Sequence, residues 1–154
     1  MKLSTERAQE IAEKYADMIY RIALHNVRSV QDAEDILQEV YVVLLTKRVP
    51  EDEEHLKNWL IRVTLNKCNS LHRSFWHKNT ESIEQHGELI AEEETSVIEE
   101  IRLLPKDERN IIYLYYYESF TIAEIAKLLH KNQNTVSSKL QRARKKLKKL
   151  IEGG

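Results

Sequence analysis

The sequence predicts an all-α protein of two small helical domains joined by a flexible acidic linker. Three observations support this fold class. Glycine and proline together number only 5 of 154 residues, too few for a turn-rich β fold. Apolar residues recur at helical spacing on both sides of a polar middle segment. Charge is segregated along the chain, with basic stretches on either side of an acidic one.

The first predicted domain, residues 1–78, contains three helices. Residues 5–26 form the first, and Ser29 caps a second that ends before Val49-Pro50. The third covers about residues 55–77. Each helix has one apolar stripe: Ile11, Tyr15, Met18 and Ile22 in the first; Ala33, Ile36 or Leu37, Val40, Tyr41 and Leu44 in the second; Leu56, Trp59, Leu60, Val63, Leu71 and Phe75 in the third.

The predicted linker covers residues 79–96. Between Glu81 and Glu100 the sequence carries eight glutamates and no lysine or arginine. Few large apolar residues accompany them, so the segment has little to bury. We expect it to repel itself and remain extended.

The second predicted domain, residues 97–154, has four helices. Val97, Ile101 and Leu104 belong to the first, and Pro105 opens a helix that runs to about Glu118. A capping box, Thr121 to Glu124, starts a short third helix. Residues 131–134 form a turn before the last helix. Most of the tyrosines at 113 and 115–117 are expected in the core or at a domain interface, and the small Ala123 and Ala126 at the helix crossing.

The helix-turn-helix pattern of residues 121–147 is the strongest functional signal. Val136 and Leu140 anchor the last helix, whose opposite face carries Ser137, Ser138, Gln141, Arg142 and Arg144. Such side chains suit base edges and phosphates in a major groove. Residues 126–150 contain nine basic residues and no acid, although the whole chain has a net charge of −1. A solvated basic surface is the simpler alternative, but the block favours DNA binding.

Other classes of protein are disfavoured. No apolar run is long enough to span a membrane, and the N-terminus lacks a signal-peptide core. A single cysteine, Cys68, excludes a disulfide framework and a multi-cysteine zinc site. No catalytic or phosphate-loop motif occurs. We therefore expect a cytoplasmic protein without membrane insertion, with no enzymatic activity, cofactor or metal.

Several segments resemble one family in the same order along the chain. Residues 104–112 (LPKDERNII), 121–126 (TIAEIA) and 135–144 (TVSSKLQRAR) resemble region 4 of bacterial sigma factors. Residues 32–40 (DAEDILQEV) and 59–66 (WLIRVTLN) resemble region 2. The combination, with no middle domain, is similar to the extracytoplasmic-function (ECF, group IV) sigma factors. The resemblance implies a protein that directs promoter-specific transcription initiation.

The resemblance also implies roles for individual residues. Its partners would be promoter DNA and core RNA polymerase, through the clamp helices of the largest subunit and the flap of the second largest, with an anti-sigma factor common in the family. Polymerase would contact Asp32, Asp35, Gln38 and Glu39. The −10 element would contact Lys57, Arg62, Asn66, Lys67, Asn69 and Arg73. The −35 element would contact Thr135, Ser137, Ser138, Lys139, Gln141, Arg142, Arg144 and Lys145.

The sequence departs from the family pattern at the turn of the helix-turn-helix. His130 stands where the family usually has glycine, and Asn134 where glycine is frequent. The turn predicts a positive φ, which histidine and asparagine tolerate better than most residues. Two alternatives remain at this stage. One is a free-standing helix-turn-helix regulator that does not act through polymerase, and the other is a helical adaptor without a DNA role.

Overall fold

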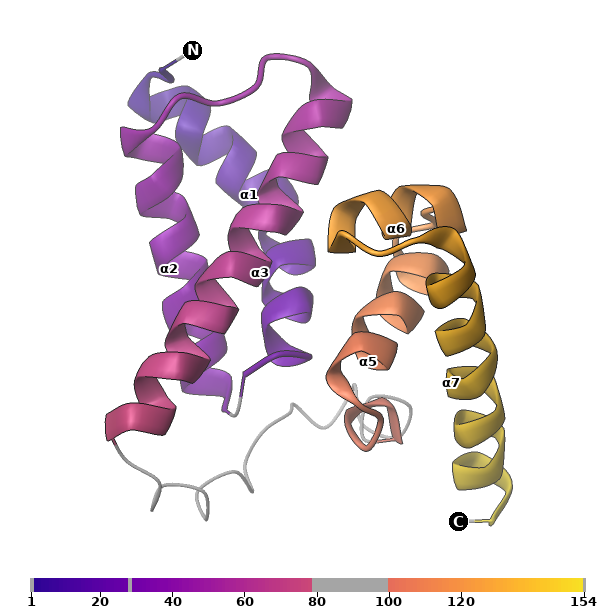
Figure 1. Cartoon of the computed structure of the whole chain (residues 1–154). Coiled ribbons are helices and arrows are strands. Elements are labelled where there is room, and N and C mark those ends of the chain that lie inside the picture. The colour runs from indigo at the N-terminus through magenta and orange to yellow at the C-terminus, as the bar shows by residue number, and fades with distance from the viewer. Residues whose placement is uncertain (1, 28, 79–99, 154) are drawn as a thin grey trace. The chain divides into compact units, whose positions relative to one another are not determined.

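A computed structural model describes residues 2–27, 29–78 and 100–153, with only the backbone described for 72–78. The chain divides into two compact units, Met1–Ile90 and Ala91–Gly154. Every regular element in the described ranges is helical, which confirms the predicted fold class there (Figure 1). The predicted linker, residues 79–96, lies outside the described residues.

The first unit is a three-helix bundle. It consists of α1 (Thr5–Leu24), α2 (Val30–Thr46) and α3 (Glu53–Lys78), each of which contacts the other two (Figure 1). The core contains large side chains from all three helices, including Ile19, Ile22, Ile36, Leu44, Leu56 and Leu60. The prediction that Ser29 caps the second helix is confirmed, since its side chain accepts a hydrogen bond from the Asp32 amide at 3.1 Å.

The buried face of α3 is rotated from the predicted one. Ile61, Thr64 and Cys68 are buried with Leu56 and Leu60, whereas Trp59 and Val63 are only half-buried. The predicted stripe included no polar residue, but the Thr64 hydroxyl donates to the Leu60 carbonyl at 2.7 Å and is thereby satisfied inside the core. Because α1 and α2 cover α3 from two sides, the buried face is wider than one apolar stripe.

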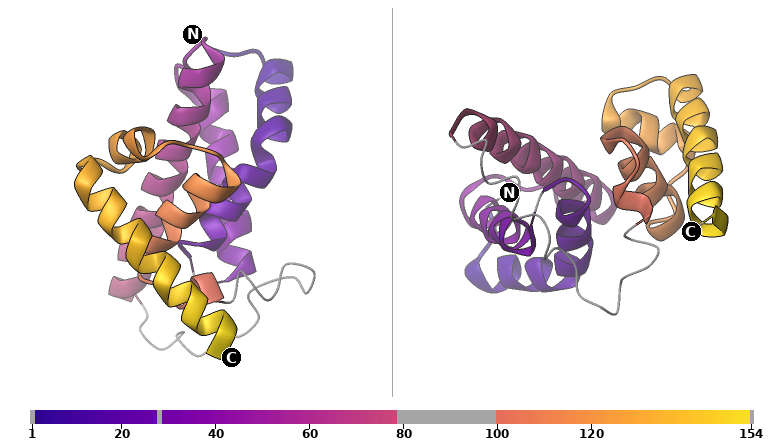
Figure 2. Two further views of the ribbon diagram at one scale, coloured as in Figure 1. Left: turned by 90° about the vertical axis from the view of Figure 1, so that its right-hand side faces the viewer. Right: turned by 90° about the horizontal axis from the view of Figure 1, so that it is seen from below.

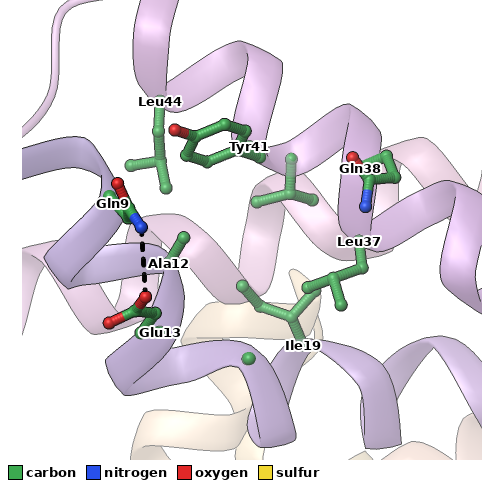
Figure 3. Close-up of a pocket in the computed structure, with 10 residues that line it drawn as sticks. Gln9, Ala12, Glu13, Ile19, Leu37, Gln38, Tyr41 and Leu44 are labelled. Atoms are coloured by element: carbon green, nitrogen blue, oxygen red, sulfur yellow. Dashed lines mark hydrogen bonds between the residues drawn. The ribbon is translucent and has the colours of Figure 1, made fainter. Parts of the chain in front are cut away.

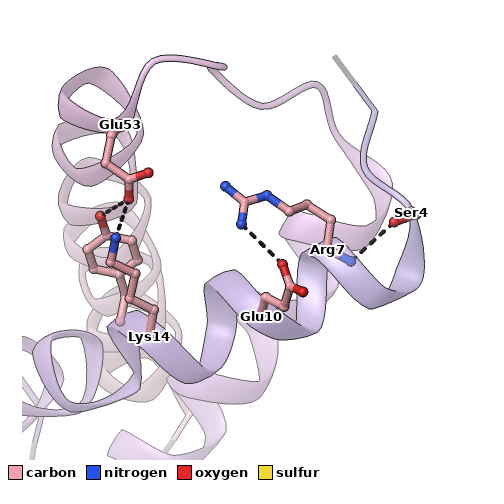
Figure 4. A network of polar contacts seen from close by, with 6 residues as sticks. Ser4, Arg7, Glu10, Lys14 and Glu53 are labelled. Atoms are coloured by element: carbon pink, nitrogen blue, oxygen red, sulfur yellow. Dashed lines mark hydrogen bonds and ion pairs between the residues drawn. The ribbon is translucent and has the colours of Figure 1, made fainter.

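A polar cluster joins α1 to the start of α3 (Figure 4). The Glu53 carboxylate accepts hydrogen bonds from Lys14 Nζ at 2.8 Å and from the Tyr15 hydroxyl at 2.5 Å. Burial, followed by the hydrogen bond and charge of Glu53, raises the pKa of Tyr15 to about 12. The two bonds connect the first turn of α3 to α1.

The second unit contains α5 (Lys106–Ile112), the π-helical turn η3 (Tyr113–Tyr117), α6 (Ile122–Leu129) and α7 (Gln133–Gly153). Residues 100–102 are also helical. α7 packs on both α5 and α6, and two views turned from Figure 1 show the unit from other sides (Figure 2). Its core contains Ile101, Leu104, Ile111, Ile112, Tyr113, Leu114, Ile125, Leu128, Val136, Leu140 and Ala143.

The predicted helix from Pro105 to Glu118 does not remain an α-helix. It widens to a π-helical turn at Tyr113, where the Glu118 amide donates to the Tyr113 carbonyl at 3.3 Å. Tyr113 is buried, but Tyr116 and Tyr117 are 52% and 49% exposed. Tyr116 and Tyr117 are therefore not part of the core of this unit, and the alternative that they lie at a domain interface stays a prediction.

The helix-turn-helix has the predicted cap and a shorter turn. The Thr121 amide donates to Glu124 at 2.8 Å, and the Glu124 amide donates to the Thr121 hydroxyl at 3.1 Å, which confirms the capping box. Asn132 caps α7 by accepting from the Thr135 amide at 2.7 Å, so α7 already begins at Gln133. Ala126 is buried as predicted, whereas Ala123 is exposed and does not serve the crossing.

His130 adopts the left-handed backbone conformation that its place in the turn predicts, with φ 58° and ψ 44°. Such a conformation costs a residue with a Cβ about 1–2 kcal/mol, and glycine avoids the clash. We expect His130→Gly to stabilise the second unit by about 1 kcal/mol and raise its melting temperature by about 4–8 °C. Calorimetry of the full chain measures this shift.

The matched control is Asn134→Gly. Asn134 is already helical, in the first turn of α7, so glycine relieves no strain there and adds backbone entropy to the unfolded chain. We expect no stabilisation. If Asn134→Gly raised the melting temperature as much as His130→Gly, relief of backbone strain at residue 130 would not be the cause of the stabilisation.

Candidate DNA and polymerase interfaces

The predicted polymerase-binding residues lie on the solvent side of α2. Asp35, Gln38 and Glu39 are exposed, while Ile36, Val40 and Leu44 on the opposite side are fully buried. Asp35 accepts a hydrogen bond from Gln31 at 3.1 Å. Asp32 is half-buried in the first turn, so it contributes less surface than the other three. The helix therefore presents a polar, mainly acidic face.

A groove between α1 and α2 adjoins this face (Figure 3). Its volume is about 400 Å³. Its floor is apolar and its rim polar; it is lined by Gln9, Ala12, Glu13, Ala16, Ile19, Leu37, Gln38, Val40, Tyr41 and Leu44. Gln38 belongs to both the groove and the acidic face. The predicted stripe offered Ile36 or Leu37 and included Tyr41. Ile36 is the buried one, whereas Leu37 and Tyr41 are half-buried and line the groove.

The six predicted −10 residues do not form one face. Arg62 and Asn66 are exposed and Asn69 is half-buried, and their spacing puts all three on the side of α3 opposite its core. Lys57 and Lys67 lie off this side. Lys67 Nζ is 3.6 Å from the Glu39 carboxylate of α2. The side chain of Arg73 lies outside the described side chains, although its helical position continues the same face.

The predicted −35 residues divide into a central face and two flanks of α7. Ser138, Gln141, Arg142 and Lys145 are exposed on the side opposite the buried Val136, Leu140 and Ala143. Thr135 and Ser137 are half-buried. The central face thus offers hydroxyl, amide, guanidinium and ammonium groups to a ligand.

The two flanking cations contact other residues of the same unit. Lys139 Nζ lies 3.3 Å from Asp107 Oδ2 in α5. Arg144 Nε donates to the Tyr116 hydroxyl at 2.5 Å, and its guanidinium lies 5.5 Å from the Tyr115 ring centroid. Sequence reasoning missed these partners because they are 28 to 32 positions away along the chain.

A second ion pair joins α7 to α5, nearer the C-terminal end of α7. Lys146 Nζ lies 3.1 Å from Glu108 Oε1, and the Glu108 side chain is only 7% exposed. Because a buried carboxylate needs a partner, this pair anchors α7 to α5.

Neither a metal site nor a membrane span is found in the described parts of the chain. The described histidines, cysteine and acidic residues form no group of three or more that could hold an ion. Cys68 is buried, as expected, and the side chain of His72 is outside the described set. Over the same residues, no helix combines the length and the apolar character needed to cross a bilayer.

Comparison with known proteins identifies the family. Residues 11–77 match Sigma-70 region 2 and residues 95–147 match Sigma-70, region 4. The ECF RNA polymerase sigma factor SigM of Bacillus subtilis is 26% identical over 155 residues, covering 94% of this chain and 95% of that protein.

Solved structures show the same fold. One is the sigma factor RpoE of Bartonella quintana, solved in complex with the anti-sigma factor NepR. It matches this chain with a TM-score of 0.70 and 18% sequence identity, and the match covers 94% of this chain and 98% of the RpoE chain. The other is CnrH, solved in complex with the cytosolic domain of CnrY. It matches with a TM-score of 0.68 and 18% sequence identity, and the match covers 97% of this chain and 90% of the CnrH chain.

The chain is thus built from regions 2 and 4 of a sigma-70 protein. It belongs to the ECF RNA polymerase sigma factors, which direct transcription initiation by binding core RNA polymerase and promoter DNA and are not themselves enzymes. This result removes the free-standing regulator and the adaptor as alternatives.

Proposed function

We propose that the exposed face of α2 is where this sigma factor docks on the clamp helices of the largest polymerase subunit. Asp35, Gln38 and Glu39 supply acceptors and charge, and the adjoining groove supplies apolar surface. The observation that carries this proposal is that polar residues of the region 2 motif are exposed beside a groove of about 400 Å³. Apolar contact with polar groups at its rim is the usual composition of a protein interface.

The DNA contacts are assigned to the other two exposed faces. The central face of α7 would read the −35 element through Ser138, Gln141 and Arg142, with Lys145 on phosphate. Further contacts to the −35 element would come from the edges of this face, through Thr135, Ser137, Lys139 and Arg144. On α3, Arg62, Asn66 and Asn69 would contact the −10 element, and Arg73 would extend this face along the helix. Lys57 and Lys67 would contact the DNA from beside it. The second unit would also meet the polymerase flap.

An anti-sigma factor is the remaining proposed partner. Both solved structures described above were obtained as complexes, one with the anti-sigma factor NepR and the other with the cytosolic domain of CnrY. A regulator of this chain would act simply by covering the α2 face or the α7 face. The expected consequence is competition, so a bound regulator and core polymerase would exclude each other.

Co-elution with sigma-free bacterial core RNA polymerase tests the docking face. The wild-type chain is expected to form a stoichiometric complex, and an Asp35→Arg, Gln38→Ala variant is expected to lose it. Charge reversal at the centre of an interface and loss of a rim hydrogen bond weaken binding by several kcal/mol, roughly a hundredfold or more. Size-exclusion chromatography followed by gel analysis measures the ratio of sigma to core.

The matched control is Asp17→Arg, which reverses an exposed charge on α1 of the same unit. This variant should still co-elute. If both variants retain full binding, α2 is not the docking face. If both lose it equally while circular dichroism shows that they are folded, binding depends on overall charge and not on this surface.

A further inference from the structure

One carboxylate of the second unit is shared by two lysines next to the α7 face. Asp107 Oδ2 lies 3.0 Å from Lys131 Nζ and 3.3 Å from Lys139 Nζ. Lys131 belongs to the turn of the helix-turn-helix, and Lys139 lies one helical turn from both Thr135 and Arg142. Asp107 itself is in the first turn of α5. A single acid from another helix thereby holds a cation of the turn and a cation of the recognition helix.

This arrangement is only partly buried. The side chains of Lys131, Lys139 and Asp107 are 26%, 27% and 39% exposed, in contrast to the 7% of Glu108 in the neighbouring pair with Lys146. Ion pairs that keep part of their surface in water contribute less to stability than a fully buried pair whose partner is removed, so exchange for another anion costs less here than it does for Lys146 and Glu108. The lysine side chain is a flexible chain with a mobile point charge, so it can change partner without a change in the backbone.

The carboxylate is ionised at neutral pH. Partial burial raises the pKa of Asp107, but the hydrogen bonds and charges of Lys131 and then Lys139 outweigh it and hold the pKa below its ordinary value. An ionised carboxylate and a DNA phosphate are the same kind of partner for an ammonium group, an anion that offers only acceptor oxygens. The two anions therefore compete for the same two lysines.

We propose that Asp107 is an internal competitor for DNA phosphate, which restrains Lys131 and Lys139 and so limits the affinity of the second unit for DNA. The inference rests on the proposed DNA-binding role of α7. Each lysine that exchanges Asp107 for a phosphate leaves an unneutralised carboxylate close to the DNA. Asp107 thus lowers affinity most for non-cognate DNA, where phosphate contacts supply nearly all of the binding.

The test is Asp107→Asn in the full-length chain, measured by fluorescence anisotropy with a labelled mixed-sequence duplex between about 50 and 200 mM salt. We expect affinity to rise several-fold. The slope of log K against log salt should become steeper by about 0.9 for each lysine that gains a phosphate. Asparagine keeps the shape of the side chain and removes only its charge, and thermal denaturation confirms that the variant is folded.

The matched control is Glu152→Gln. It removes the same charge from an exposed position of α7 without releasing either lysine, so we expect the salt slope to remain that of the wild type. If Glu152→Gln strengthens binding as much as Asp107→Asn, net charge explains the gain and the proposal is wrong. An unchanged or weaker affinity of Asp107→Asn also overturns it.

Lys139→Gln gives a second measurement that does not depend on the Asp107 variant. In the wild-type chain it should reduce affinity less than Lys145→Gln does, because Lys139 must first leave Asp107. In the Asp107→Asn chain the two losses should become similar. Equal losses in the wild-type chain contradict the proposal.

Failure of the proposed DNA face gives a different result. If an Arg142→Ala, Lys145→Ala variant binds the duplex as well as the wild type, α7 is not the DNA-binding face, and the inference about Asp107 falls with it. If that variant binds weakly but Asp107→Asn shows no gain, only the role of Asp107 is rejected.

Discussion

Replacing Arg142 with alanine is expected to lower transcription from this sigma factor's own promoters by about 5- to 150-fold. Arg142 is exposed at the middle of the central face of α7, where a guanidinium can bind guanine O6 and N7 together. A bidentate contact of this kind contributes about 1–3 kcal/mol of discrimination, which corresponds to the stated range. Run-off transcription from promoters mapped with the wild-type holoenzyme measures the loss.

Two controls separate reading of a base from simple attraction to phosphate. Arg142→Lys keeps the charge but cannot form the planar double contact, so it should restore little of the lost transcription. Core polymerase binding should be unchanged in both variants, because Arg142 belongs to the proposed DNA face and the docking residues proposed for the clamp helices lie on α2. Full activity of Arg142→Lys would show that Arg142 contacts phosphate, and a parallel loss of core binding would show that the recognition face is misplaced.

Features that depend on neighbouring residues could be predicted from the sequence. The Thr121 capping box and the Ser29 cap follow from side-chain chemistry within four residues, and both are present. The positive φ of His130, which is also present, is implied by the resemblance, because the family usually has glycine at this position. The buried sides of α1 and α2 could also be predicted from nearby residues, because apolar residues three and four positions apart lie on the same side of a helix. The residue motifs of both sigma regions could be recognised for the same reason.

Features that depend on distant residues could not be predicted. Among the described residues, Ser119 also has a positive φ, 61°, and it lies two residues after a π-helical turn that no periodicity indicated. The rotated face of α3 depends on which sides α1 and α2 cover. The same limitation affects the site, because Lys139 and Arg144, two of the predicted −35 residues, have partners in α5 and η3 that are distant along the chain.

The prediction with the largest effect on stability concerns Leu60, which is fully buried in α3 among residues of all three helices of the first unit. Leu60→Ala is expected to cost about 2–5 kcal/mol, the lost burial of the side chain plus the cavity that it leaves. Small domains are stable by about 5–15 kcal/mol, so this one change removes a large share of the total. Val42→Ala on α2, at a side chain 53% exposed, should change stability by no more than about 0.5 kcal/mol.

Unfolding of the first unit can be followed by a signal of its own. Its two tryptophans, Trp59 and Trp76, both belong to α3, so tryptophan fluorescence reports unfolding of the first unit alone, whereas circular dichroism reports both units. In urea, Leu60→Ala should move the fluorescence transition, which reports the first unit, to a lower urea concentration. The part of the dichroism transition that belongs to the second unit should stay at the same urea concentration. Because the proposed docking face is on α2, core binding should fail under conditions in which the Arg142 face is still folded. A matching shift of both signals would mean that the two units unfold together, and loss of promoter recognition could then not be assigned to either one.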